Sequence, residues 1–312
     1  MTVDAPARTG PHRHLLDVDT WSRDQIEDLL SLAVEMRTAR ASHAHRSLLE
    51  AETVGLAFYE PSTRTRVSFE LAAKALGATV VDLAIERSSV GKGESLVDTL
   101  RTLERTGVTT VILRHSASGA PDLAARETGL RVINAGDGMH AHPTQALLDA
   151  LTLHEALGPL DGKLIAIVGD VAHSRVARSN LHALGTLGAR LRVGGPAAWV
   201  AGFEQWPGVE TATTMAAALE GADAVMALRV QVERAAVDSI GSIDDHVRDW
   251  RLDDVRMQRA APGAPLLHPG PTNEGIEITA ALANGPRSLI GRQVENGVPV
   301  RMAVLARLAG MA

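Results

Sequence analysis

Three hydroxyl groups and two guanidinium groups stand together in the run Ser62-Thr63-Arg64-Thr65-Arg66. The run follows an apolar, strand-like segment (53–59) and precedes a segment whose apolar residues have helical spacing (67–77). A helix start presents unpaired backbone N–H groups and the positive end of the helix dipole, which attract phosphate. Hydroxyls add donors, and an arginine binds two phosphate oxygens at once. The run therefore predicts a phosphate site, although a capped helix with solvated arginines would carry the same residues.

Polar residues also follow other strand-like segments. They are Arg114 after 108–113, His142 and Gln145 ahead of a long helix, Arg175 in a turn after 163–168, Arg229 and Gln231 after 222–228, and the turn His268–Pro271 after 265–267. Proteins with parallel sheets bind ligands at the carboxyl ends of the strands. Each residue alone also fits a turn or a solvated surface charge. Together they predict a site for a small polyanion in the cleft between two domains.

The turn Gly169–Arg175 follows a strand and opens a helix, as a dinucleotide-binding turn does. It lacks the G-x-G-x-x-G spacing that brings a pyrophosphate close to the backbone. A Rossmann-type nucleotide-binding protein is therefore the weaker alternative.

The elements that must position these residues alternate between helix and strand. A helix is expected after Ser22, and further helices at 144–157 and about 292–308; strands are expected at 53–59, 79–83, 108–113, 130–134, 163–168, 190–193, 222–228 and 265–267. Such alternation is typical of parallel sheets covered on both faces. The expected fold is α/β, with two doubly wound parallel-sheet domains and the active site in the interdomain cleft. The domains are expected at residues 1–150 and 151–291, and the C-terminal helix (about 292–312) is expected to pack back on the first.

The composition excludes several classes of protein. The chain has 312 residues, 45% of them hydrophobic, and a net charge of −6, which argues against general nucleic-acid binding. It has no cysteine, which excludes a disulfide scaffold, a thiolate nucleophile and a cysteine-bound metal. No apolar run reaches the ~18 residues of a membrane span, and the N-terminal residues lack the apolar core of a secretion signal. We therefore expect a cytoplasmic protein that binds neither membrane nor nucleic acid.

Two longer motifs resemble those of a known family. Phe58–Arg66 resembles the carbamoyl-phosphate signature of the aspartate and ornithine carbamoyltransferases, and His142–Asp149 resembles their second signature. The match continues in order through His268–Pro271 and covers the chain from the first helix onward. The resemblance implies that domain 1–150 binds carbamoyl phosphate and that domain 151–291 binds the second substrate.

Within this family the sequence is more similar to the aspartate enzymes. Ser88–Glu94 resembles their loop in which a serine and a lysine reach a neighbouring subunit's site, and Arg229–Gln231 resembles their aspartate-recognition loop. Ornithine enzymes carry a cysteine where this chain has His268–Pro271. A substrate with two carboxylates also suits Arg175 and Arg229. The implied reaction moves the carbamoyl group to the α-amine of L-aspartate, an early step of pyrimidine synthesis; ornithine or another amino acid is the alternative acceptor.

The resemblance also implies roles for individual residues. The residues implied to be catalytic are Arg64, Thr65, Arg114, His142 and Lys92. Those implied to bind carbamoyl phosphate are Ser62, Thr63, Arg64, Thr65, Ser88, Lys92, Arg114, His142, Gln145, Leu267, Gly270 and Pro271. Those implied to bind aspartate are Lys92, Arg175, Arg229 and Gln231. No metal and no organic cofactor is expected, since carbamoyl phosphate is already activated.

A lysine that acts in a neighbouring site requires an oligomer, and the family suggests a homotrimer with active sites shared between subunits. Whether Ser88 or Ser89 meets the phosphate stays open, with Ser88 preferred for its spacing from Lys92. Relatives also assemble with regulatory or dihydroorotase-like chains, and nothing in this sequence identifies such a partner.

Overall fold

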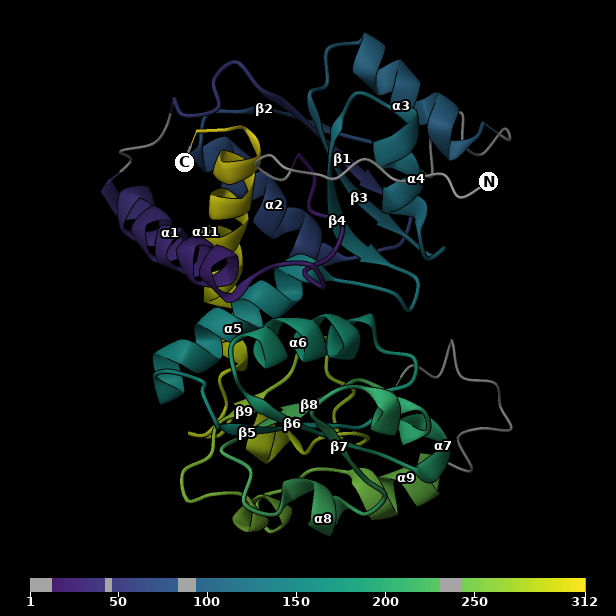
Figure 1. Ribbon diagram of the computed structural model, residues 1–312, viewed down its shortest axis with the longest axis vertical. Helices are drawn as coiled ribbons and strands as arrows, with labels where there is room; N and C mark the ends of the chain where they lie inside the picture. The colour runs from purple at the N-terminus through teal and green to yellow at the C-terminus, as the bar shows by residue number, and fades with distance from the viewer. Residues whose placement is uncertain (1–12, 43–46, 84–93, 231–242, 312) are drawn as a thin grey trace. The chain divides into compact units, whose positions relative to one another are not determined.

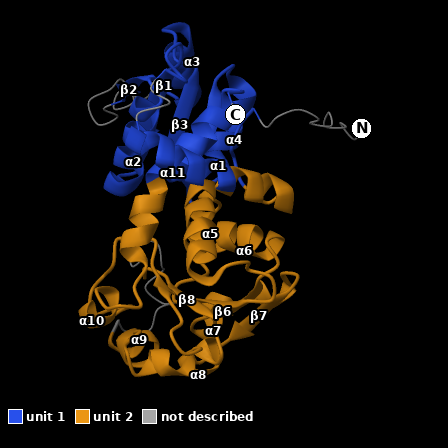
Figure 2. Ribbon diagram, turned by 90° about the vertical axis from the view of Figure 1, so that its left-hand side faces the viewer, with its two compact units in different colours: residues 1–17, 31–138, 298–312 blue, residues 18–30, 139–297 orange. Residues whose placement is uncertain are grey.

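The computed structural model describes residues 13–42, 47–83, 94–230 and 243–311 of the chain. The chain divides into two compact units, shown in Figure 2. Unit 1 comprises residues 1–17, 31–138 and 298–312, and unit 2 comprises residues 18–30 and 139–297. The division after residue 138 precedes the boundary expected near residue 150, because helix α5 (Pro143–Leu157) packs against α6 (Arg175–Thr186) within unit 2. Two helices, α1 (Arg23–Ser42) and α11 (Ile290–Leu308), carry residues of both units.

Unit 1 is built on a four-stranded parallel sheet in the order β2-β1-β3-β4 (Figure 1). Its elements are β1 (Thr53–Phe58), α2 (Thr63–Ala75), β2 (Thr79–Asp82), α3 (Leu96–Arg105), β3 (Thr110–His115), α4 (Ala120–Glu127) and β4 (Arg131–Asp137). Every parallel connection needs a crossover, and the helices between the strands provide it. The strands read as continuous apolar runs because helices cover both faces of such a sheet.

The two faces of this sheet are packed by different helices. Leu100 of α3 and Ala124 of α4 cluster with Val111 and Val132, which project from one face. On α2, Phe69 is fully buried, and the Arg301 guanidinium lies over its ring, 4.9 Å from the centroid. Residue 301 belongs to α11, so the end of that helix joins the core of unit 1.

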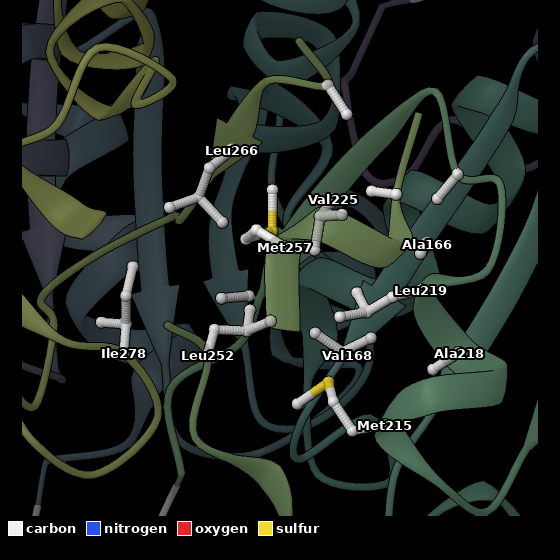
Figure 3. Packing of buried hydrophobic residues seen from close by; sticks show 14 of the residues in the cluster. Ala166, Val168, Met215, Ala218, Leu219, Val225, Leu252, Met257, Leu266 and Ile278 are labelled. Carbon is white, nitrogen blue, oxygen red and sulfur yellow. The ribbon is translucent and has the colours of Figure 1, made fainter. Parts of the chain in front are cut away.

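Unit 2 contains a five-stranded parallel sheet in the order β7-β6-β5-β8-β9. Its further elements are β5 (Leu164–Val168), β6 (Arg190–Gly194), α7 (Ala197–Val200), β7 (Val209–Ala212), α8 (Met215–Leu219), β8 (Ala224–Ala227), α9 (Ile243–Trp250), β9 (Leu266–Leu267) and α10 (Ala280–Ala283). Figure 3 shows the core on one face, where Val168, Val225 and Leu266 meet Leu219 of α8. Ile165 and Ile167, which alternate with the residues of this core along β5, are also fully buried and face the other side of the sheet.

The two parallel sheets confirm the predicted α/β fold. The short edge strand β7 was not among the expected elements. One position is corrected: Arg114, expected just after a strand, lies within β3, which runs on to His115. The ladder is irregular between Leu113 and His115, so the strand continues two residues beyond its regular apolar run.

Candidate active site

The predicted phosphate site lies where β1 turns into α2. Ser62 is the N-cap residue of α2, with extended backbone, and its side chain makes no capping hydrogen bond among the described residues. Thr63 and Arg64 are exposed, whereas Thr65 is buried. The first turn of α2 contains no acidic residue. An exposed helix start with hydroxyls, the Arg64 guanidinium and no acidic residue in its first turn is suited to an anion.

Arg114 lies at the same edge of the sheet. β3 is the neighbour of β1, with Phe58 opposite Arg114 in the ladder, so both chain segments leave the sheet side by side. The Arg114 Nη2 donates to Glu60 Oε1 at 2.7 Å and Nη1 donates to the Ala135 carbonyl at 3.2 Å. The side chains of Arg114 and Glu60 are only 11% and 19% exposed. The pair therefore holds the Arg114 guanidinium in a largely buried position.

A pair of aromatic rings borders this edge. The Tyr59 and His115 rings lie 5.0 Å apart. Burial lowers the pKa of His115, while Asp137 and Glu60 oppose that effect. Burial also raises the pKa of the Tyr59 hydroxyl. Both rings are therefore neutral at pH 7, and the positive charge at this edge comes from arginine.

In unit 2, His142 is held at the start of α5 by helix α6. The buried His142 is the N-cap residue of α5, and its backbone N–H donates to Ser179 Oγ at 2.9 Å. The preceding segment is held by Arg178, whose Nη1 donates to the carbonyls of Met139 (3.1 Å) and Ala172 (2.9 Å). Burial lowers the pKa of Arg178. α6 thus holds the backbone at the start of α5.

Gln145 lies one turn into α5 and is 8% exposed. Its Nε2 donates to Asp149 Oδ1 at 2.9 Å, across one turn of the helix. Asp149 itself is fully buried. A carboxylate only accepts hydrogen bonds, so it meets the NH₂ end of the Gln145 amide and leaves the oxygen on the other side.

Arg175 is the first residue of α6 and is buried. A cation in the first turn of a helix opposes the helix dipole, so the position has no advantage for the stability of the helix itself. The turn before it is ordered by Asp170, which accepts from the backbone N–H of His173 at 3.3 Å and contacts its Nδ1 at 2.7 Å. A buried arginine at a helix start is suited to a carboxylate ligand.

The remaining described candidates of unit 2 follow the neighbouring strands β8 and β9. Arg229 is half-buried and follows the buried Leu228 after β8. Leu267 ends β9 and pairs with β8, and Gly270 and Pro271 lie in the turn beyond it. Since β5, β8 and β9 are adjacent, the ends of these strands bring these residues to one edge, with Arg175 following β5.

Three predicted site residues, Ser88, Lys92 and Gln231, lie outside the described residues. Within the described ranges, no three His, Asp or Glu side chains form a group that could hold a metal ion. No helix in that part of the chain is long and apolar enough to cross a membrane.

Sequence reasoning assigned no role to three residues that hold the candidate site. Glu60 pairs with Arg114, Asp149 accepts from Gln145, and Gln293 of α11 donates to Asp149 at 2.7 Å. The i, i+4 spacing of Gln145 and Asp149 on a helix was a signal for the second contact. The other two join segments far apart in the sequence.

Comparison with known proteins gives matches over nearly the whole chain. The family model for the carbamoyl-phosphate-binding domain of aspartate/ornithine carbamoyltransferases matches residues 13–155, and the model for their Asp/Orn-binding domain matches residues 161–308. Aspartate carbamoyltransferase catalytic subunits from Methylorubrum extorquens and Thermus thermophilus are each 49% identical. These alignments cover 96% and 95% of this chain and 95% and 97% of the relatives.

Solved structures agree with this result. The aspartate transcarbamoylase of Trypanosoma cruzi, in complex with carbamoyl phosphate and aspartate, matches with a TM-score of 0.85 and 30% identity over 94% of this chain and 96% of that one. The ornithine carbamoyltransferase of Thermus thermophilus matches with a TM-score of 0.83 and 28% identity over 96% and 99%. The chain therefore belongs to the aspartate/ornithine carbamoyltransferase family.

Proposed function

We infer that this protein transfers the carbamoyl group of carbamoyl phosphate to the α-amine of L-aspartate, giving N-carbamoyl-L-aspartate and phosphate. The observation that carries this inference is the 49% identity to aspartate carbamoyltransferase catalytic subunits over nearly the full length of both chains. The arrangement of polar side chains at strand ends in each unit supports it.

Carbamoyl phosphate is assigned mainly to unit 1. Its phosphate is held by Ser62, Thr63, Arg64 and the backbone N–H groups that begin α2. The exposure of Thr63 and Arg64 and the absence of an acidic residue from that first turn support this assignment. Arg114 bridges the phosphate and the carbonyl oxygen, which requires its guanidinium to exchange part of its contact with Glu60 for the substrate.

The carbamoyl group is assigned hydrogen-bond donors for its carbonyl oxygen and acceptors for its NH₂. Thr65, Arg114 and His142 donate to its carbonyl oxygen. Gln145 accepts from its NH₂ through Oε1, because Nε2 is bonded to Asp149. The main chain around Leu267, Gly270 and Pro271 supplies further acceptors for the same NH₂.

Aspartate is assigned to the arginines of unit 2. Arg175 and Arg229 each offer a guanidinium for one carboxylate. Gln231 and Lys92 complete the site, and Ser88 joins Lys92 at the phosphate. This choice of side chains favours aspartate over ornithine, whose second amino group would be repelled by two arginines.

The reaction follows from these positions. The neutral α-amine attacks the carbonyl carbon, and the carbonyl oxygen becomes an oxyanion stabilised by Thr65, Arg114 and His142. The bond to the phosphate oxygen then breaks, and the departing phosphate takes the proton from the amine. Each such donor is worth roughly 3–4 kcal/mol of barrier. Holding two reactants in a fixed orientation supplies much of the remaining acceleration.

The wider setting belongs to the same proposal. The enzyme acts in the cytoplasm, in pyrimidine biosynthesis, as a homotrimer in which Ser88 and Lys92 of one subunit complete the site of its neighbour. The resemblance of the loop Ser88–Glu94 to that of aspartate enzymes supports the shared site.

The test is an assay for ureido products with carbamoyl phosphate, run in parallel with L-aspartate and L-ornithine. Turnover with aspartate alone is expected. Turnover with ornithine alone would retain the residues assigned to carbamoyl phosphate but overturn the roles of Arg175 and Arg229. No turnover with either acceptor would contradict the proposed function.

A further inference from the structure

Asp149 connects Gln145 with the turn after β9. The proposed function assigns both of them to the NH₂ of the carbamoyl group. Oδ1 of this fully buried carboxylate accepts from Gln145 Nε2 at 2.9 Å and from Gln293 Nε2 at 2.7 Å. Its Oδ2 accepts from Asn180 Nδ2 at 2.9 Å. Three amide groups, from α5, α6 and α11, thus donate to one carboxylate.

Gln293 continues this network to the turn after β9. Its Oε1 accepts from the backbone N–H of His268 at 2.9 Å. A backbone N–H is always a donor, so it fixes the Gln293 amide with the oxygen toward His268 and the NH₂ toward Asp149. Gln293 is 3% exposed, so these contacts are shielded from water.

For the Gln145 amide, the described residues provide a side-chain hydrogen bond to Asp149 and no backbone group that fixes it in the same way. The oxygen and nitrogen of an amide have nearly the same shape, and hydrogen bonding alone selects between the two orientations. Its contact with Asp149 selects the orientation with Nε2 on the carboxylate side. An NH₂ in place of Oε1 would oppose the NH₂ of a carbamoyl group, donor against donor.

We propose that Asp149 is a positioning residue for recognition of the carbamoyl NH₂. It fixes the orientation of the Gln145 amide and, through Gln293, the turn at His268 that follows the Leu267 carbonyl. The proposal rests on the proposed function, because only carbamoyl phosphate brings that NH₂ to these acceptors. Asp149 does not touch the substrate and acts through its two glutamine partners.

The matched test compares two phosphorylated donors. Acetyl phosphate differs from carbamoyl phosphate in having CH₃ where the latter has NH₂, and inorganic phosphate lacks the acyl group altogether. For each variant, the KM for carbamoyl phosphate is measured at saturating aspartate, and acetyl phosphate and phosphate are measured as competitive inhibitors. The ratio of the inhibition constant of acetyl phosphate to the KM for carbamoyl phosphate reports recognition of the NH₂. The inhibition constant of inorganic phosphate reports the phosphate site.

Asp149→Asn is expected to lower the preference for carbamoyl over acetyl phosphate roughly tenfold, since the new amide cannot accept from all three donors. Binding of inorganic phosphate should stay within about twofold, because none of the residues assigned to the phosphate lies on α5 or α11. Thr152→Val is the matched control. Thr152 is equally buried one turn along α5 and accepts from Asn296 of α11 at 3.1 Å, with no bond to Gln145. This control should keep the wild-type ratio.

A lower Tm with an unchanged preference would show that Asp149 is only structural and would overturn the proposal. Should Asp149→Asn fail to fold, Gln293→Met removes the link to His268 while leaving Asp149 and Gln145 in contact. A reduced preference in that variant supports the proposal, and an unchanged one contradicts it. A wild-type enzyme without turnover would overturn the proposed function, whereas wild-type turnover with a ratio unaffected by either variant would overturn only the role of Asp149.

Discussion

The arginines of unit 1 differ in how firmly the protein itself holds them. Arg64 is exposed in the first turn of α2, whereas Arg114 is held between Glu60 and the Ala135 carbonyl in a nearly buried position. Loss of Arg64 is therefore expected to remove a proposed ligand for phosphate without removing a buried contact. Loss of Arg114 would also remove the guanidinium that pairs with the Glu60 carboxylate, whose side chain is only 19% exposed.

Arg64→Ala is expected to reduce kcat/KM by at least about a hundredfold, because a charge-assisted donor to the transferring group is lost. Its Tm should match that of the wild type, since no buried contact is removed. Lys74→Ala serves as the control: Lys74 is an exposed residue at the other end of α2, paired with Glu70. Near-normal activity of a folded Arg64→Ala protein would contradict the assignment of residues 62–65 to phosphate.

His246 is the residue whose titration should affect stability most directly. It is 3% exposed, its two ring nitrogens make no hydrogen bond within the described residues, and its ring lies 5.4 Å from that of Trp199. Burial lowers the pKa of His246 below 6.5, and the nearby Glu277, Asp170 and Asp249 only partly oppose this. The unfolded chain thus binds this proton more readily than the folded one. The resulting stability is complete above pH 6.5 and is lost as the pH falls toward the lower folded pKa.

His246→Phe keeps an aromatic ring against Trp199 and removes the titration. Unfolding by urea, measured at about pH 8 and about pH 5.5, should show a smaller acid loss of stability in the variant than in the wild type. His115 titrates in both proteins, so their difference isolates His246. Equal losses in the two proteins would show that His246 does not set this dependence.

Among the elements, the ends of β5 and β8 approach closely at a glycine. Gly169, just after β5, has φ +118°, and the Leu228 backbone N–H donates to the carbonyl of the preceding Val168 at 2.8 Å. A Cβ at this position would lie 2.9 Å from the carbonyl oxygen of Leu228, the residue before Arg229. The close approach of the two strand ends therefore depends on the absence of a side chain.

Gly169→Ala is expected to lower the free energy of unfolding by about 1–3 kcal/mol, because alanine is strained at this φ and crowds Leu228. Displacement of Arg229 should raise the KM for aspartate more than the KM for carbamoyl phosphate. Gly291→Ala is a suitable comparison, since a Cβ there meets no atom within 4 Å. Equal changes in both KM values would contradict a local effect on Arg229.

The sequence was sufficient to predict most elements and the strand ends near which the candidate site residues lie. β5 is an uninterrupted apolar run followed by a glycine, and α5 is a long apolar helix opened by His142 and Pro143. β7 was missed because it has only four residues, two of which, Glu210 and Thr211, are polar, and because it lies at the sheet edge.

The contacts that the candidate residues make were harder to predict than their positions along the helices and strands. Asp149 and Gln293 lie 144 residues apart, and no local pattern connects an amide of the last helix with a carboxylate of α5. The pairing of Arg114 with Glu60 likewise depends on the register of β1 against β3, which is a property of the sheet.

At the scale of the whole molecule, the proposed sharing of sites gives a quantitative prediction. Arg64→Ala and Lys92→Ala should each be inactive alone, since each lacks one half of every site. After dissociation and reassembly of an equal mixture, about one quarter of the sites in a random cyclic trimer would combine an intact Arg64 with a neighbour's intact Lys92.

The control mixture combines Arg64→Ala with Arg114→Ala. Both residues belong to unit 1 of one chain and lie at the same sheet edge, so mixing should restore no site. Mass measurement of the reassembled trimers establishes that exchange took place. Verified hybrids without recovered activity would show that Lys92 serves its own subunit.

The path of the chain limits how this protein could exchange parts with its relatives by recombination. The chain passes from one unit to the other after residues 17, 30, 138 and 297. A single genetic crossover after residue 138 would combine Arg23 from one parent with Asp161 from the other, although in unit 2 Arg23 Nη1 donates to Asp161 Oδ1 at 2.8 Å. Transfer of the complete unit 2 needs all four junctions at once. New acceptor specificity is therefore expected to arise by substitutions around Arg175 and Arg229 rather than by domain shuffling.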